Sequence, residues 1–418
     1  MNILWITNTI FPLPSKLLGI PSPVVGGWMY GLASQVAACP DINLAVATTY
    51  PGKELKAYNI VNVRYYLLPA KSKTAYQKEL EPAWQTICDE FNPDIVHIHG
   101  TEFSHGLACM RSCHELKYIV SIQGLVSVIA NYYYYGMSFF DILKNVTFRD
   151  IVRMDTIFSG KRKFKNRGEF EKEYIQKTKQ IIGRTSLDYA HTKSINPDVN
   201  YHFCNESLRD GFYSADKWKI TNKTNHTIFL SQAGYPIKGA HQVIKAAALL
   251  KKDFPGIQIR IAGYDITAAQ SLLQKLRLSG YGNYLRNLIN KADLCRSVQF
   301  MGSLSENQMI DEYKNAHLFI CPSSIENSPN SLGEAQIIGT PTIAAYVGGV
   351  PDMIVHGDTG LLYRFEEVEM LAENIRRVFT DDFLAKKLSV NSIAAAEQRH
   401  HRQTNLNQIL NIYCKVSS

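Results

Sequence analysis

The segment SSIENSPNSLGEAQIIGTP carries two carboxylates whose spacing could serve a single ligand. Glu326 lies just before a predicted helix start, and Glu334 lies just inside that helix. Pro329 disfavours a helical conformation at Ser328 and suits the first helical position, so the pattern predicts a helix with Ser328 as its N-cap. The helix is predicted to end at Gly339.

Apolar stretches flank this helix, HLFICPS before it and TPTIAAYVGG after it. The order strand, loop, helix, strand is typical of a βαβ unit in a parallel sheet. In such sheets ligands bind outside the carboxyl ends of the strands, where this loop falls. The first-turn amides of Asn330, Ser331 and Leu332 lack intrahelical partners, and together with the helix dipole they are predicted to form an anion site.

A carboxylate beside an anion site repels the anion unless it accepts hydrogen bonds from another part of the ligand, such as the hydroxyls of a sugar. The pair therefore points to a ligand that carries both phosphate and sugar. An alternative interpretation needs no ligand. In that case Glu334 is a first-turn acid favoured by the helix dipole, and Glu326 is a solvated loop residue.

The elements that must position these residues alternate along the whole chain. Apolar segments rich in β-forming residues alternate with helical patterns, for example at 239–252, 267–291 and 305–315. Two successive sets of such elements imply two doubly wound α/β domains. The predicted strands are NILWITN, INLAVATT, VRYYLLP, DIVHIHG, KYIVSIQ and QIIGRT in the first half, and HTIFLSQAG, IQIRIAG, VQFMGS, HLFICPS, TPTIAAY and GLLYRF in the second.

At 418 residues the chain is too long for one ordinary core. The polar, unpatterned segment 217–226 is typical of an interdomain linker, so we expect one Rossmann-like domain over 1–222 and a second over 223–394. The tail at about 395–418 is helical in composition, and packing back on the first domain is one option for it. A ligand cleft is expected where the two domains face each other.

The composition is that of an ordinary globular protein, with 20% charged and 45% hydrophobic residues. The net charge of +8 favours phosphorylated or membrane-surface partners and is too small to imply nucleic acid. No stretch approaches the roughly 18 continuous apolar residues of a membrane span. Because MNILWITNTIFPLP lacks the features of a signal peptide and is typical of a first strand, we expect a cytoplasmic protein.

The eight cysteines are mostly isolated within apolar segments and form no CxxC pair. Disulfides are not expected in a chain of this size and compartment. Only Cys109 and Cys113 are close enough in sequence to share a helix face, and we interpret both as packing residues rather than metal ligands. His97 and His99 have no accompanying Cys or acidic ligand pattern, so no metal site is predicted.

An insertion separates KYIVSIQGL from QIIGRT. It contains the aromatic run NYYYYGMSFF and then five Lys or Arg residues within 161–167. Such side chains can anchor at a lipid headgroup layer or hold a phosphorylated acceptor, so an anionic membrane surface is a candidate partner of residues 131–167. The alternative is a solvated basic loop beside a tyrosine-rich packing patch.

Four motifs, in order along the chain, resemble one enzyme family. VVGGWMYGLASQVA resembles its Gly-Gly loop, PIKGAHQVIKAAALL its Lys-Gly helix start, IENSPNSLGEA its Glu-x7-Glu signature, and GGVPDMIVHGDTGLL its next loop. The family comprises the retaining glycosyltransferases of group 1, family 4, which include sucrose synthases and mannosyltransferases and adopt the two-domain GT-B fold. The resemblance is strong over about 226–380 and weaker over 1–200, where DIVHIHG resembles the strand end that lines the acceptor cleft.

The resemblance implies a nucleotide-sugar donor, whose diphosphate needs positive charge and amide donors as it leaves. Lys238 matches the family's phosphate lysine, and Gly26 and Gly27 would let backbone amides approach the donor. Glu334 would hold the nucleotide ribose, and Glu326 the hydroxyls of the transferred sugar. The remaining implied donor contacts are the amides of Asn330, Ser331 and Leu332, and a base pocket at Tyr264, Asp265, Met301 and Gly302.

Two positions depart from the family pattern. Gln232, among the donor contacts, stands where the family usually has Arg, and Gln123 stands where it often has His. Arg184 or the basic insertion is a candidate replacement for the missing charge. His99 is a candidate for a protonatable group near the anomeric carbon, with a satisfied histidine at a strand end as the alternative. The implied catalytic residues are Glu326, Lys238 and His99, and the implied acceptor contacts are His99, Gln123 and Arg184.

The implied reaction is a retaining sugar transfer in which the leaving phosphate accepts the proton of the acceptor hydroxyl. No Asp-x-Asp sequence occurs, so neither a donor-binding metal nor another cofactor is expected. A UDP-sugar is the default donor, with GDP-mannose left open. The hypothesised acceptor is a lipid-linked saccharide or glycolipid of bacterial polysaccharide assembly at the inner face of the membrane, with a soluble acceptor as the alternative. Competing functions are a 2-epimerase or sugar phosphorylase of related architecture, and a non-catalytic sugar- or lipid-binding relative.

Overall fold

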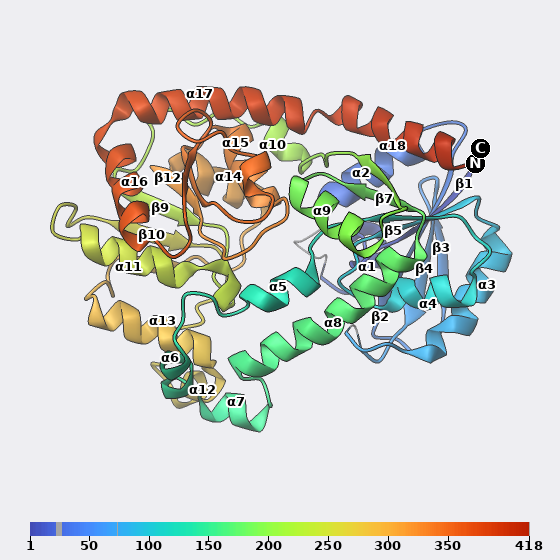
Figure 1. Ribbon diagram of the computed structural model, residues 1–418, viewed down its shortest axis with the longest axis horizontal. Helices are drawn as coiled ribbons and strands as arrows, with labels where there is room; N and C mark the ends of the chain where they lie inside the picture. Colours follow the sequence, from blue (N-terminus) through green and yellow to red (C-terminus); the bar gives the residue numbers. More distant parts are fainter. Residues whose placement is uncertain (22–26, 73, 418) are drawn as a thin grey trace. The chain divides into compact units, whose positions relative to one another are not determined.

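A computed structural model of the chain describes residues 1–21, 27–72 and 74–417 (Figure 1). The chain forms two compact units. Unit 1 comprises Met1–Val128, Phe164–Asp210 and His400–Ser418, and unit 2 comprises Ile129–Lys163 and Gly211–Arg399. The division falls within three helices, α5 (Val126–Tyr132), α8 (Ile157–Lys177) and α10 (Asp210–Ser214), and again between Arg399 and His400.

Unit 1 is built on an eight-stranded sheet with the strand order β3-β4-β2-β1-β5-β6-β7-β8. Neighbouring strands are parallel, except that β3 and β4 are antiparallel. The strands are β1 (Asn2–Ile6), β2 (Asn43–Tyr50), β3 (Lys56–Ile60), β4 (Val63–Pro69), β5 (Ile95–His99), β6 (Tyr118–Ser121), β7 (Gln180–Gly183) and β8 (Asn200–Phe203). The other elements of this unit are α1 (Pro12–Leu17), α2 (Gly27–Ala37), η1 (Lys78–Leu80), α3 (Glu81–Phe91), α4 (His105–Ser112), α9 (Ser186–Ile195) and α18 (Arg402–Ser417).

The unit 1 sheet is covered on both faces, which explains its nearly continuous apolar strands. Successive side chains of a strand point to opposite faces. Trp5 of β1 accordingly packs in a cluster with side chains of α2 and α18, whereas Leu4 packs in a second cluster with side chains of α3 and α4.

Unit 2 is built on a six-stranded parallel sheet with the order β11-β10-β9-β12-β13-β14. Its strands are β9 (Thr227–Leu230), β10 (Gln258–Ile261), β11 (Val298–Phe300), β12 (Leu318–Cys321), β13 (Thr342–Ala345) and β14 (Leu361–Tyr363). Its other elements are α6 (Phe139–Lys144), α7 (Phe148–Val152), α10 (Asp210–Ser214), η2 (Pro236–Lys238), α11 (Ala240–Leu250), α12 (Leu272–Arg277), α13 (Gly280–Lys291), α14 (Glu306–Asn315), α15 (Asn330–Ile338), η3 (Val350–Asp352), α16 (Val368–Thr380) and α17 (Asp382–Arg399). The strand order reverses between β9 and β12, which makes their carboxyl ends the topological switch point, where ligands of such sheets bind.

The twelve predicted strands and the doubly wound fold are confirmed. Sequence reasoning missed β3 and β8, which form the two edges of the unit 1 sheet. Both edge strands are only half-buried or exposed, with the sequences KAYNI and NYHF. Because an edge strand packs on fewer neighbours, it needs no continuous apolar run, and the pattern gave no signal.

The single helix predicted over 267–291 was wrong, because the segment forms α12 and α13. Ser271 caps α12 by accepting from the amide of Gln274, and Ser279 caps α13 by accepting from the amide of Gly282. A Cβ at Gly282 would lie 2.0 Å from the carbonyl oxygen of Ile266. The second cap and this close approach break the helical run.

The segment 217–226 is part of unit 2, not a linker between domains. The side chain of Trp218 is buried and donates from Nε1 to the carbonyl oxygen of Ala316 at 2.8 Å. Lys217 donates to the carbonyl of Ile337 at 2.8 Å. The division expected at 222/223 lies instead at 210/211, because Lys217 and Trp218 bond to carbonyl oxygens of unit 2.

The C-terminal helix α18 belongs to unit 1. The hydroxyl of its buried Tyr413 accepts from Nε1 of Trp5 at 2.9 Å and lies 2.7 Å from Nδ1 of His97. Nε2 of His97 in turn lies 2.7 Å from Oγ of Ser121. A buried polar chain thus joins α18 to β1, β5 and β6.

The insertion folds as helices, and its basic run 161–167 lies on α8 rather than in a loop. Several of these cations are engaged: Lys163 pairs with Asp155 at 2.8 Å, Lys161 lies over the ring of Tyr134, and Arg167 donates to the carbonyl of Glu102 at 2.8 Å. Within the described part of the chain, no helix has both the length and the apolar character that crossing a membrane requires.

Candidate active site

The loop after β9 ends in the short 3-10 helix η2, which carries Lys238. Gly239 follows with φ +66° and is the N-cap of α11. A Cβ at this position would lie 1.8 Å from the carbonyl oxygen of Pro322, the residue after β12. The Lys-Gly pair has a physical reason here, since only glycine lets the start of α11 approach the end of β12 so closely.

Lys238 and Glu326 form an ion pair at the switch point. Nζ of Lys238 lies 2.6 Å from Oε1 of Glu326, and Oγ of Ser323 donates to the same oxygen at 2.7 Å. Both side chains of the pair are largely buried, at 16% and 15% exposure. Burial alone would lower the pKa of Lys238, but the Glu326 charge, with Tyr235 and the hydrogen bond, outweighs it and raises that pKa. Lys238 is therefore charged at neutral pH.

The helix after Glu326 begins later than predicted. Pro329, with extended backbone (φ −71°, ψ 118°), is the N-cap, and α15 starts at Asn330. The amide of Leu332 donates to the carbonyl of Pro329 at 3.0 Å, so the prediction that it is unpaired was wrong. Among the described residues the amides of Asn330 and Ser331 make no such bond. The predicted end is confirmed, because Gly339 caps the helix with φ +85°.

Glu334 is buried, with 6% exposure, and lies beyond the first turn of α15, which contains no acid. The ligand-free interpretation, a first-turn acid favoured by the helix dipole, therefore does not fit its position. Glu334 is thus a buried carboxylate inside the helix that follows β12.

The loop after β13 holds the backbone of Glu326 in place. The amide of Gly349 donates to the Glu326 carbonyl at 3.0 Å. Gly348 has φ +54°, and a Cβ there would lie 2.0 Å from the same carbonyl oxygen. The GGVPD segment thus acts on the candidate site through its backbone.

A small cavity at the switch point brings four of the predicted donor residues together: Gln232, Lys238, Glu326 and Ser331. Among the residues that line this cavity, Lys238 carries a positive charge. Gln232, which is uncharged, occupies the position where the family that the sequence resembles usually has an arginine. The remaining lining residues are Ser231, Ile320, Cys321, Pro322 and Ser323.

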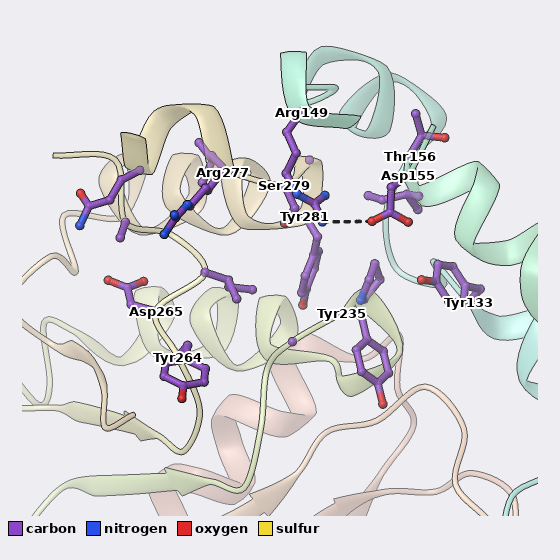
Figure 2. A pocket seen from close by; sticks show the side chains of 18 residues that line it. Tyr133, Arg149, Asp155, Thr156, Tyr235, Tyr264, Asp265, Arg277, Ser279 and Tyr281 are labelled. Atoms are coloured by element: carbon purple, nitrogen blue, oxygen red, sulfur yellow. Dashed lines mark hydrogen bonds and ion pairs between the residues drawn. The ribbon is translucent and has the colours of Figure 1, made fainter. Parts of the chain in front are cut away.

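A larger cavity of about 650 Å³ lies beside Tyr235 in unit 2 (Figure 2). Such a volume is within the range of small-molecule sites. Tyr264 and Asp265, implied at the base pocket, line it. Sequence reasoning missed the contributions of Arg149 and Arg277, because they come from α7 and α12, which no motif marks.

Met301 and Gly302, also implied at the base pocket, are not among the described residues that line this cavity. They follow β11, where the amide of Met301 donates to the carbonyl of Ile261 at 2.8 Å. Gly302 has φ +74° and pairs with Gly263 in an isolated bridge. The structure thus places them two strands away from β9 and Lys238.

His99 lies in unit 1 at the end of β5 and is 2% exposed. Its ring packs 3.9 Å from the ring of His97 and 4.2 Å from that of Trp5, measured between centroids. Burial lowers its pKa to about 3, so the imidazole is neutral at neutral pH. Neither ring nitrogen has a hydrogen-bond partner among the described residues. His99 is therefore a neutral imidazole and not a cationic acid.

Gln123 and Arg184 meet in unit 1, but around a third residue that sequence reasoning missed. Arg184 pairs with Glu206, and both side chains are buried. Nε2 of Gln123 donates to the same Glu206 oxygen at 2.5 Å, and Arg184 donates to Oε1 of Gln123 at 3.2 Å. Arg184 is thus already neutralised by a carboxylate, which weakens it as a substitute for the missing phosphate cation.

Gly27 begins α2, and a Cβ there would lie 3.2 Å from the side chain of Arg209. Gly26 lies outside the described residues.

The packing prediction for Cys109 and Cys113 omitted a partner. The sulfur atoms of Cys88, Cys109 and Cys113 lie within 4.8 Å of one another, between α3 and α4. Cys88 and Cys109 are buried in the unit 1 core, and Cys113 is half-buried at its margin. The 20 residues between Cys88 and Cys109 concealed this grouping from spacing arguments.

Part of the chain matches the model of a known protein family. Residues 214–399 match the model of the family described as glycosyl transferases group 1. A D-inositol 3-phosphate glycosyltransferase of Corynebacterium urealyticum is 25% identical over 146 residues, which is 35% of this chain and 33% of the relative. Across the first three curated relatives the match spans only 16% to 43% of the relative's own length.

Solved structures match over the whole chain. Sucrose-phosphate synthase from Thermosynechococcus elongatus gives a TM-score of 0.74 at 14% identity, covering 100% of this chain and 99% of the other. Anabaena HepE, crystallised with UDP and glucose, gives 0.67 at 14% identity, covering 99% and 100%. At this identity the likeness establishes the fold, which is that of the GT-B glycosyltransferases. The segment that matches the glycosyl transferases group 1 model, residues 214–399, contains Lys238, Glu326 and Glu334.

Proposed function

We propose that the protein transfers a sugar from a nucleotide-sugar donor to a hydroxyl acceptor. The observation that carries the proposal is the Lys238–Glu326 ion pair at the carboxyl ends of β9 and β12, inside the segment that matches the family. A donor offers phosphate oxygens to the lysine and sugar hydroxyls to the carboxylate, so one ligand satisfies both members of the pair. Glu334, buried on the helix that follows Glu326, accepts hydrogen bonds from the hydroxyls of the ribose.

The reaction is proposed to retain the anomeric configuration. The leaving phosphate, held by Lys238, accepts the proton of the incoming hydroxyl, so no strong enzymic base is needed. The neutral state of His99 is compatible with this scheme, because the scheme assigns no cationic acid to it. Lys238 and the amides of Asn330 and Ser331 carry the phosphate charge, and we propose that no donor-binding metal takes part.

A UDP-sugar is the proposed donor, and a lipid-linked saccharide or glycolipid is the proposed acceptor. The HepE structure, determined with UDP and glucose, supports the choice of base through the shared fold. The neutral Gln232 beside Lys238 favours a second candidate, a non-catalytic sugar-binding relative, because it removes one phosphate cation from the site.

The first test is a thermal-shift and calorimetric screen of UDP, GDP and ADP with their sugars. A ligand that binds only the folded chain raises the melting temperature by mass action. We expect UDP and a UDP-sugar to stabilise the parent protein, and the Glu334→Gln variant to lose that response. Glu369→Gln, an exposed acid on α16, is the matched control and should respond like the parent. Failure of every nucleotide to bind would reject the donor site.

Catalysis is tested separately with a labelled donor and lipid-linked acceptors. The anomeric configuration of the product, read by NMR, decides between retention and inversion, and activity in the presence of a chelator tests metal independence. Binding without transfer to any acceptor would favour the non-catalytic candidate.

A further inference from the structure

Two short helices of unit 2 expose large apolar side chains. On α6 these are Phe139, Phe140 and Leu143, which are 58%, 70% and 48% exposed. On α7 they are Phe148, Ile151 and Val152, which are 68%, 66% and 63% exposed, and Met154 follows at 79%. A surface helix normally turns its apolar stripe to the core, whereas α7 buries Asp150 and α6 buries only Ile142 of its apolar residues.

The polar side chains of this insertion fasten it to the rest of unit 2. The carboxylate of Asp150 is buried and accepts from the amide of Gly280 at 2.8 Å. Oδ1 of Asn145 accepts from the side chains of Asn283 and Asn287 at 3.1 and 2.8 Å. Since these bonds hold one side of the helices against α13, the exposure of the apolar side is a built feature of the fold.

Helix α12 extends the same surface from a distant part of the sequence. It contacts α7 and lies beside it in Figure 1. Leu272, Leu273 and Leu276 of α12 are 73%, 66% and 46% exposed. Exposed apolar side chains that gather on helices in contact with one another indicate an interaction site.

The unpaired charges around the apolar side chains are mainly positive. The three acids between residues 129 and 163 are engaged: Asp141 accepts from Ser138, Asp150 pairs with Arg149, and Asp155 pairs with Lys163. The helix α12 contains no acid. The charged side-chain groups of five residues form no hydrogen bond or ion pair with any residue that the structure describes: Lys144, Arg153, Arg162, Lys275 and Arg277.

We propose that the surface formed by α6, α7 and α12 docks on an anionic lipid bilayer. Phe140, Ile151, Met154 and Leu273 would enter the interface between headgroups and acyl chains, and the unpaired cations would meet the anionic headgroups. The excess of positive charge favours an anionic bilayer over a second copy of this chain, which would bring like charges together. The surface is formed by other elements than those that carry Lys238 and Glu326, so the inference does not depend on the proposed reaction.

The experiment is a co-sedimentation assay with phosphatidylcholine vesicles, with and without about 30% phosphatidylglycerol. We expect the parent protein to bind the anionic vesicles, to bind the neutral ones weakly, and to be released by salt. The combined variant Phe148→Ser, Ile151→Ser and Leu273→Ser should reduce partitioning to anionic vesicles about tenfold or more.

The matched control combines Leu249→Ser, Phe383→Ser and Val390→Ser, three exposed apolar residues elsewhere in unit 2. It should bind vesicles like the parent. Both combined variants should keep the thermal response of the parent to nucleotides, which separates loss of docking from loss of fold or of the donor site.

A fluorescence measurement reports insertion directly. The four native tryptophans are buried, so Phe140→Trp introduces an exposed reporter. Its emission should shift to the blue with anionic vesicles and be quenched by brominated acyl chains. No vesicle binding by the parent, or equal binding by the first variant, would overturn the proposal. A parent dimer that the first variant dissociates, without vesicle binding, would assign the surface to self-association instead.

Discussion

Lys238 and Glu326 are 88 positions apart in the chain, yet Nζ of the lysine lies 2.6 Å from Oε1 of the glutamate. In this state each group satisfies the other, and each is the group that a nucleotide sugar would need. A bound donor would replace the pair by two contacts, phosphate with lysine and hydroxyl with carboxylate. The ion pair is thus the ligand-free form of the candidate site.

Removing either member of this pair should weaken both the fold and the site. Lys238→Met or Glu326→Gln is expected to lower the free energy of unfolding by about 1–3 kcal/mol, because each leaves a largely buried polar group without its partner. The double variant should lose less than the sum of the two. Urea denaturation of the parent, the two single variants and the double variant measures this double-mutant cycle. If the losses in free energy of unfolding simply add, the contact between the two side chains is contradicted. Lys238→Met should also weaken nucleotide binding at least about tenfold.

The Gln232→Arg variant tests whether the missing cation limits donor affinity. A second positive charge beside Lys238 is expected to strengthen binding of a nucleoside diphosphate about tenfold, since one charge-assisted hydrogen bond contributes about 1.5–3 kcal/mol. Calorimetry against the parent and against the uncharged Gln232→Met variant measures this. Equal affinities of all three proteins would mean that the phosphate does not reach this side of the cavity.

Gly348→Ala should impair the site through the backbone of Glu326. Gly357 offers a matched control, because its φ of +78° resembles the +54° of Gly348 while its Cβ would meet nothing within 4 Å. Both alanine variants are expected to lose about 1–2 kcal/mol of stability from the left-handed conformation. Only Gly348→Ala, whose Cβ meets the Glu326 carbonyl, should also lose nucleotide binding. Equal binding by both would show that the loop does not set the position of Glu326.

Tyr413→Phe should destabilise unit 1. The Tyr413 hydroxyl lies between Nε1 of Trp5 and Nδ1 of His97, so its removal leaves buried polar atoms without a partner. The expected loss in free energy of unfolding is about 1–3 kcal/mol by urea denaturation. Tyr189→Phe, at a tyrosine that is 50% exposed, should change it by less than about 0.5 kcal/mol. If Tyr413→Phe leaves the free energy of unfolding unchanged, the hydrogen-bond network around Tyr413 contributes no net stability.

Stability should fall as the pH drops below about 6.5, because burial lowers the pKa of His99, His241 and His317 to about 3. The unfolded chain then binds protons that the folded chain does not. The contribution of each histidine is complete above its unfolded pKa and is lost toward pH 3, at about 1.4 kcal/mol per pH unit. Urea midpoints from pH 8 to 5 measure the slope. His99→Gln should flatten it, whereas His114→Gln, at an exposed histidine, should not.

How much the sequence determined depends on whether a feature is local. The strands inside both sheets and the end of α15 at Gly339 follow from short-range patterns, because burial on both faces and a positive φ constrain neighbouring residues directly. The strand, loop and helix pattern also placed Glu326 and Ser331 at a strand end and a helix start, whereas Gln232 and Lys238 were assigned to the same site through the resemblance to the glycosyltransferase family.

Only the tertiary structure decided which side chains are paired and which are exposed. Arg184 is neutralised by Glu206, His99 is buried against Trp5, and the apolar sides of α6 and α7 face outward. No local sequence pattern predicts this pairing, burial and exposure. They depend on which strands lie side by side, and on which face of each helix packs against residues that are distant in the sequence.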